Sequence, residues 1–125
     1  MQTYSPFVNI CMFEGYIHKQ PEYTAKPLPQ HQTLHTISIT ISQPTGIYIR
    51  CIALGNLAIR LKALDLSHDD KVYVHSQFRP HMTEDNRYVM RFIIDKLVVI
   101  EKKTSPIPLE YTADNNTYDL LEYLT

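Results

Sequence analysis

The chain has 125 residues, of which 44% are hydrophobic and 20% are charged, and its formal net charge at pH 7 is −1. That length suits one domain, and the composition is typical of a soluble globular protein. The three glycines are too scattered for a glycine-rich phosphate loop or a dinucleotide fingerprint. No apolar run is long enough to cross a bilayer and no signal peptide is visible, so we expect a cytoplasmic protein.

Charge is distributed unevenly along the chain. Residues 104–125 contain four acids and no Lys or Arg, whereas residues 1–103 contain 12 bases and 9 acids, a net charge of +3. We therefore expect a mildly basic domain over residues 1–103 and an acidic C-terminal tail over residues 104–125. A basic body is compatible with a polyanionic partner.

Alternating apolar residues predict three strands in the first half of the chain. Residues 8–18 are apolar on both faces, which indicates cover on both sides, and a second subunit could supply one of them. Residues 19–33 hold three prolines and few large apolar groups, which predicts a loop. Residues 34–42 alternate isoleucine with hydroxyl side chains. After a short turn, residues 47–54 form a third strand, with Tyr48, Arg50, Ile52 and Leu54 on one face.

The period then changes to that of a helix. Asn56 is a candidate cap, and leucines at helical spacing predict a short helix that ends near Leu66. Residues 71–79 and 87–101 again alternate as strands, joined by a polar hairpin loop at residues 80–86. The predicted fold is all-β, a five-stranded OB-fold Greek-key barrel with one short helix between strands 3 and 4.

Several stretches, in this order, resemble the bacterial-type single-stranded DNA-binding protein (SSB) family. The strongest match is residues 48–58, YIRCIALGNLA, which resemble the family's WHRVVxFGKLA. Residues 9–17 with the following QPE resemble its first strand and Asp-Pro-Glu exit, and residues 71–79 and the Arg-Tyr pair at 87–88 resemble its last two strands. The resemblance extends from residue 9 to about residue 100.

The resemblance implies a nucleoid-associated, non-catalytic protein that needs no cofactor. It implies sequence-independent binding of single-stranded DNA in replication, recombination or repair, by a homo-oligomer that is a tetramer or a dimer. Such binding needs surfaces on which bases stack and cations beside them. The candidate nucleic-acid-binding residues are Tyr16, Lys19, Tyr48, Arg50, Leu54, Tyr73, Arg79, Arg87 and Arg91.

The chain also departs from the family pattern, which would suit a phage or mobile-element member. It contains no Trp; Tyr48 stands where the family has a tryptophan and Leu54 where it has a phenylalanine. The loss of tryptophans favours an alternative, a primosome-type adaptor that mainly binds replication proteins. An RNA-binding OB module is a third hypothesis.

The tail lacks the family's acidic tip that ends in Ile-Pro-Phe. Its acidic and apolar residues could bind replication or recombination proteins, or could fold back on the domain. The residues in question are Asp119, Leu120, Leu121, Glu122, Tyr123 and Leu124.

Other chemistry finds little support in the sequence. His31 and His35 have no third ligand near them, so we predict no metal site. Cys11 and Cys51 are far apart in apolar runs, which favours two buried free thiols over a disulfide. No nucleophile with a base and no paired carboxylates can be argued, so we expect no catalysis. Any single tyrosine could also be an ordinary strand former on a half-buried face.

Overall fold

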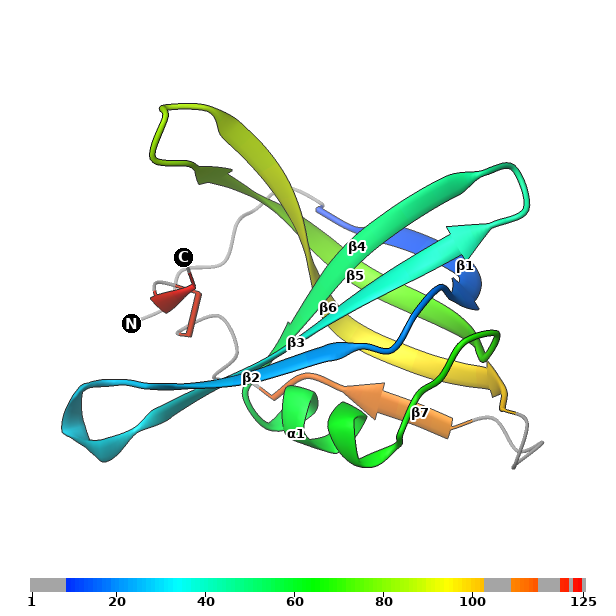
Figure 1. Cartoon of the computed structure of the whole chain (residues 1–125), viewed down its shortest axis with the longest axis horizontal. Coiled ribbons are helices and arrows are strands. Elements are labelled where there is room, and N and C mark those ends of the chain that lie inside the picture. Colours follow the sequence, from blue (N-terminus) through cyan, green and yellow to red (C-terminus); the bar gives the residue numbers. More distant parts are fainter. Residues whose placement is uncertain (1–8, 103–108, 115–119, 122, 125) are drawn as a thin grey trace.

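A seven-stranded sheet with one α-helix beside it makes up the described part of the chain (Figure 1). This computed structural model describes residues 9–102, 109–114, 120–121 and 123–124. The elements in chain order are β1 (Cys11–Ile17), β2 (Glu22–Pro27), the short 3-10 helix η1 (Pro29–His31), β3 (Thr33–Gln43), β4 (Ile47–Leu54), α1 (Asn56–Ala63), β5 (Lys71–Met82), β6 (Tyr88–Glu101) and β7 (Leu109–Thr112).

Side-chain alternation sets the two faces of this sheet. In β3 the isoleucines Ile37, Ile39 and Ile41 are buried, and the hydroxyl residues between them lie on the other face, as predicted. The strand order is β1-β5-β6-β4-β3-β2, with β7 beside β6, and β4 runs parallel to β6. Because β1 also pairs with β3 at Tyr16 and Ile17, the path through the sheet returns to its first strand. The sheet therefore has an inner face, which holds the core, and an outer face.

The prediction of five strands was wrong in number, and the helix follows the fourth strand rather than the third. β2 lies within the expected loop, where Pro21 and Pro27 flank or end the strand and so cost few ladder hydrogen bonds. Its Tyr23 is half-buried against the core. β7 lies within the expected tail and pairs with β6. The predicted hairpin loop is shorter than expected, because β5 continues to Met82 and β6 begins at Tyr88.

Helix α1 begins differently from the predicted cap. Gly55 precedes it with a positive φ of 67°, a conformation that glycine adopts most easily. The Asn56 side chain caps no helical N–H and instead donates a hydrogen bond to Asp114 Oδ2 at 2.7 Å. Leu57, Ala58 and Leu61 are buried against the sheet and anchor the helix.

Buried side chains form two clusters, one on each face of the sheet. The larger lies on the inner face and includes Cys51, where burial raises the thiol pKa to about 12 and keeps it protonated. Cys11 is only half-buried, and both cysteines are free. The smaller cluster consists of Leu34, Leu54 and Ile93, whose alternation places them on the outer face. This second cluster lies at one end of the candidate site.

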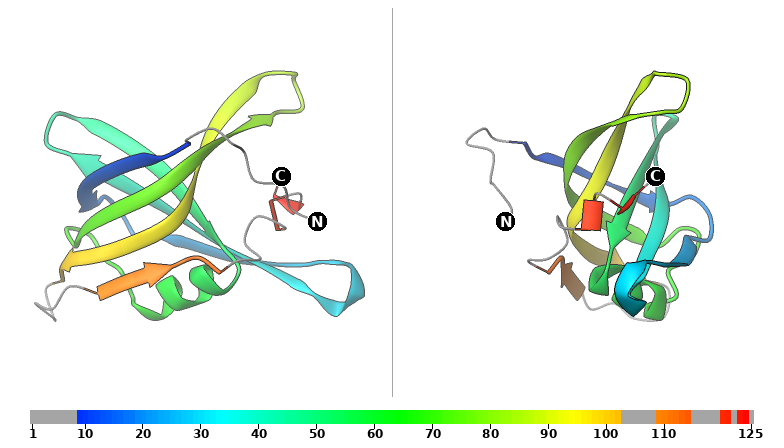
Figure 2. Two further views of the ribbon diagram at one scale, coloured as in Figure 1. Left: turned by 180° about the vertical axis from the view of Figure 1, so that it is seen from behind. Right: turned by 90° about the vertical axis from the view of Figure 1, so that its left-hand side faces the viewer.

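Hairpins extend from the sheet on both sides of residues 120–121 and 123–124, which we call the C-terminal segment. The β5–β6 hairpin (olive) lies on one side of this segment (red) and the β2–β3 hairpin (blue to cyan) on the other (Figure 1). The two views of Figure 2 show the same arrangement. The space between these hairpins is where the candidate site is found.

Candidate nucleic-acid interface

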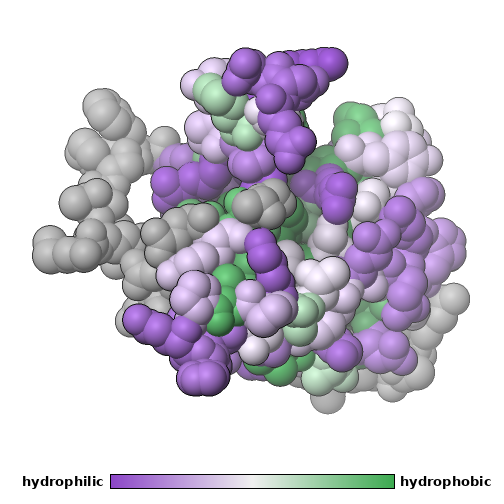
Figure 3. Space-filling view, turned by 60° about the vertical axis from the view of Figure 1, so that its left-hand side comes forward, coloured by the Kyte–Doolittle hydropathy of each residue, from purple (hydrophilic) through white to green (hydrophobic). Residues whose placement is uncertain are grey.

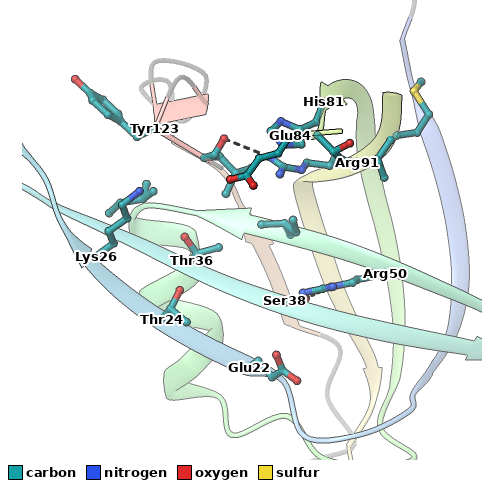
Figure 4. Close-up of a pocket in the computed structure, with 16 residues that line it drawn as sticks. Glu22, Thr24, Lys26, Thr36, Ser38, Arg50, His81, Glu84, Arg91 and Tyr123 are labelled. Atoms are coloured by element: carbon teal, nitrogen blue, oxygen red, sulfur yellow. Dashed lines mark hydrogen bonds between the residues drawn. The ribbon is translucent and has the colours of Figure 1, made fainter. Parts of the chain in front are cut away.

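A groove of about 780 Å³ lies over the outer face of β2, β3 and β4 and below the β5–β6 hairpin. Its floor carries a row of hydroxyl groups from Thr24, Thr36 and Ser38, all pointing outward by strand alternation (Figure 4). Figure 3 shows hydrophobic side chains recessed between hydrophilic projections on this side of the molecule. The groove is therefore polar at its floor and partly apolar in its depth.

Two guanidinium groups line the groove from different strands. Arg50 on β4 donates from Nε to Ser38 Oγ at 2.7 Å, and Arg91 enters from β6 (Figure 4). Partial burial, and then the nearby charge of Arg50, lower the pKa of Arg91. Arg79 lies directly opposite Arg91 in the β5–β6 register and donates from Nη2 to Gln77 Oε1 at 2.8 Å. A bound anion such as a phosphate would be attracted to the positive charge of these side chains.

The groove also contains acids. Glu22 on β2 and Glu84 in the β5–β6 turn line it together with the cations Lys26, Arg50 and Arg91. Figure 4 shows Glu84 close to His81 and Arg91. The groove lining therefore mixes three cations with two acids, and it is not uniformly positive.

The C-terminal segment closes one end of the groove. Leu120, Leu121, Tyr123 and Leu124 pack against Leu34, Leu54 and Ile93, and Leu54 is 0% exposed. The carbonyl oxygen of Leu124 accepts a hydrogen bond from Arg91 Nη1 at 3.3 Å, drawn as the dashed line in Figure 4. Cδ1 of Leu120 lies only 2.9 Å from the position that a Cβ on Gly55 would occupy, so glycine allows this close approach. These tail residues fold back on the domain, while Asp119 and Glu122 lie outside the described residues.

Tyr48 marks the opposite, open end of the same face. It is 60% exposed and shares its face of β4 with Arg50 and Leu54, as predicted. The register places Tyr48 opposite Ser42, and Ser42 opposite Tyr16 on β1. Tyr16 is 36% exposed, and the Lys71 ammonium lies 5.9 Å from its ring centroid. Two tyrosines thus lie in one row across β1, β3 and β4, with a cation beside them.

The remaining candidate residues do not line the groove. Tyr73 on β5 is opposite Glu14 and Val98, and its hydroxyl contacts the Met12 sulfur at 2.9 Å, so it does not join Tyr48. The exposed Arg87 pairs with Asp85 at 3.0 Å in the hairpin turn. Lys19 pairs with Glu22 at 3.7 Å on the surface.

Several groove residues were not predicted as site residues. Strand β2 contributes Glu22, Thr24 and Lys26. This segment was predicted to be a loop because of its prolines. His81 and Glu84 come from the hairpin that was expected to be only a loop. The signal that could have found the first group is the i, i+2, i+4 spacing of polar side chains in residues 22–26.

The described residues show neither a metal-binding cluster nor a membrane-spanning helix. Among them, no three His, Cys, Asp or Glu side chains gather so that they could hold a metal ion. His35 instead hydrogen-bonds through Nδ1 with the Tyr23 hydroxyl. No helix in the described ranges has the length and apolar character needed to span a membrane.

The fold has a counterpart among solved structures. The crystal structure of the SSB domain of a protein from Synechococcus sp. superposes with a TM-score of 0.56 at 10% sequence identity, and the match covers 75% of this chain and 98% of that one. No protein-family model matches the sequence, and no curated protein is similar to it. At this identity the likeness shows the fold alone. The described part of the chain is mostly β, with one α-helix, and has an OB-like fold.

Proposed function

We propose that this chain binds single-stranded DNA without sequence preference through the outer face of β3 and β4. The observation that carries the proposal is that Arg50 and Arg91 line one groove, on the same face as the exposed ring of Tyr48. Phosphates would lie at the guanidinium groups and a base would stack on Tyr48. The OB-like fold, which the Synechococcus SSB domain shares, supports this assignment.

Binding of this kind is not catalysis. A protein that binds only unpaired strands shifts the equilibrium away from hairpins by mass action and protects exposed DNA. This is the role that such a protein has in replication, recombination or repair. The hydroxyl row of Thr24, Thr36 and Ser38 would supply hydrogen bonds that do not depend on base identity.

We further propose that the chain forms a homo-oligomer through β1. This strand pairs with β5 from Cys11 to Tyr16, but its register with β3 covers just Tyr16 and Ile17. Ile10 and Met12 are 49% and 60% exposed beside it. A second copy could add to this strand edge and cover these side chains. Light scattering on the purified chain should give a dimer or tetramer mass, and a monomer mass would contradict this part.

A salt titration tests DNA binding. Fluorescence anisotropy of labelled oligo-dT should give an affinity whose logarithm falls linearly with the logarithm of salt concentration, with a slope of about −0.7 per phosphate contact. A duplex of equal length is the control and should bind much more weakly. Failure to bind the single strand at low salt would overturn the proposal.

The adaptor alternative is favoured by the covered Leu54 end and by Glu22 and Glu84 in the groove. It predicts weak oligo-dT binding with a shallow salt slope in the same titration. Competition between DNA and RNA oligomers of equal length separates DNA binding from the RNA-binding alternative, because only RNA offers 2′-hydroxyl groups.

A further inference from the structure

Three aromatic rings gather at the open end of the outer face, beyond the groove. The ring centroids of Tyr48 and His18 are 4.6 Å apart with an interplanar angle of 62°, and those of His18 and His68 are 6.4 Å apart. Neither histidine was a candidate site residue. We call Tyr48, His18 and His68 the ring cluster.

Backbone contacts fix the ring cluster in place. His68 lies in the turn after α1, and its Nδ1 donates to the carbonyl oxygen of His18 at 2.5 Å. The same turn is tied to the end of β1, because Asp69 N donates to Ile17 O at 3.0 Å and Ile17 N donates to Asp70 O at 2.8 Å. Nε2 of His68 is 3.3 Å from the carboxylate of Asp69. The two histidines are therefore brought together by the fold, although they are 50 residues apart in the sequence.

The ring cluster is continuous with the guanidinium groups. The backbone N–H of His18 donates to Thr40 O at 2.9 Å, and Thr40 lies opposite Arg50 in the β3–β4 register. His18, Thr40 and Arg50 thus form one row, and Tyr16, Ser42 and Tyr48 form the next. A strand bound at Arg50 therefore meets the rings without crossing to another face of the sheet.

Resting on the proposed function, we propose that the ring cluster is a second base-stacking site, so that single-stranded DNA continues past Arg50 over Tyr48, His18 and His68. The ligand class is the nucleobases of an unpaired polynucleotide. Aromatic faces stack with any base. Lys71, which pairs with Glu14 at 3.5 Å, lies near Tyr16 and would exchange that carboxylate for the adjoining phosphate. The C-terminal segment covers the outer face at Leu54. A bound strand would therefore extend in the other direction, toward the open end.

The test compares two oligomer lengths on the full chain. His18→Ala/His68→Ala should weaken binding of an oligo-dT of about 16 nucleotides by roughly 5- to 150-fold, the range for losing one stacked base, and should change binding of one of about 4 nucleotides by less than about twofold. His75→Ala, on the outer face of β5 and 3.9 Å from Asp95, is the matched control and should leave both affinities unchanged. His18→Phe/His68→Phe should restore most of the lost affinity, since it keeps the rings.

The outcomes separate the two proposals. If the wild-type chain binds the long oligomer and the alanine double variant binds it equally well, the ring cluster is not a binding site. That result would leave the proposed role of the groove unaffected. An equal loss for both lengths, not restored by phenylalanine, would mean that the histidines only support the fold, and would also overturn the ring cluster as a site. A wild-type chain that binds neither oligomer would overturn the proposed function and this inference with it. Thermal melting of each variant identifies any that fail to fold.

Discussion

The outer face of β4 differs at its two ends. At one end Tyr48 is 60% exposed and contacts His18, while at the other Leu54 is fully buried below the C-terminal segment. Arg50 and Ile52 lie between them and line the groove. All four side chains share one face of a single strand, so their different exposure comes from the other segments packed beside them.

This comparison shows how one strand can carry both an open surface and a closed one. The closed end is apolar, because Leu120 and Leu121 complete a small core with Leu34, Leu54 and Ile93. The open end has a ring and a nearby guanidinium group, which is what an unpaired base and its phosphate need. Arg91 links the two ends, because it lies near Arg50 and also donates to the Leu124 carbonyl.

The largest effect is expected at the middle of the face. Arg50→Gln/Arg91→Gln should weaken oligo-dT binding by more than about 100-fold, since each of the two hydrogen bonds to a charged group contributes at least roughly 1.5 kcal/mol. The salt slope should become shallower by about 1.4, that is, by two phosphate contacts. Lys96→Gln is the control, because Lys96 does not line the groove and its ammonium lies 3.2 Å from the carboxylate of Glu110. An unchanged salt slope in the double variant would remove both arginines from the interface.

The second-largest loss of affinity is expected at Tyr48, and Tyr73 provides the comparison because the sequence did not distinguish the two tyrosines. Tyr48→Ala should weaken binding by about 1–3 kcal/mol with the fold intact, because the side chain is mostly exposed. Tyr73→Ala should not weaken binding, since Tyr73 lies opposite Glu14 on another part of the sheet. Anisotropy titrations of both variants make the comparison. Equal losses would mean that the strand does not follow the β3–β4 face.

Removal of the closed end should act in the opposite direction. Deleting residues 116–125 should keep or raise DNA affinity, by up to about fivefold, because it removes acids and frees Arg91 from the Leu124 carbonyl. It should also lower the melting temperature, because Leu34, Leu54 and Ile93 lose their cover. Melting curves and titrations on the shortened chain measure both. A clear drop in affinity would show that the segment supports the interface.

The smallest effect is expected from an acid in the groove. Glu84→Gln should raise oligo-dT affinity about twofold, because it removes an exposed negative charge near Arg91. Glu101→Gln, at the far end of β6, serves as the control. A decrease in affinity for Glu84→Gln would indicate that this carboxylate positions Arg91.

Local pattern predicted the strands but not their surroundings. The alternation in residues 34–42 and 47–54 was sufficient for β3 and β4, and it correctly placed Tyr48, Arg50 and Leu54 on one face. Burial of Leu54 depends on Leu120 and Leu121, more than 60 residues later, which no local period reports. Side-chain alternation also does not tell where a residue lies around a sheet that returns to its first strand. Tyr73 was therefore included with Tyr48 among the candidate residues, although the two lie on different parts of the sheet. The histidines of the ring cluster were missed because a turn and a strand end bring them together.

The most direct test of the proposed DNA-binding site is to find which face of the sheet the DNA contacts. Amide resonances of the ¹⁵N-labelled chain can be followed during titration with oligo-dT. If the DNA binds the β3–β4 face, we expect the largest shifts at Tyr48, Arg50 and Arg91, with little change at Tyr73 and His75. Shifts centred on Tyr73 and His75, with Tyr48 and Arg50 unmoved, would contradict it.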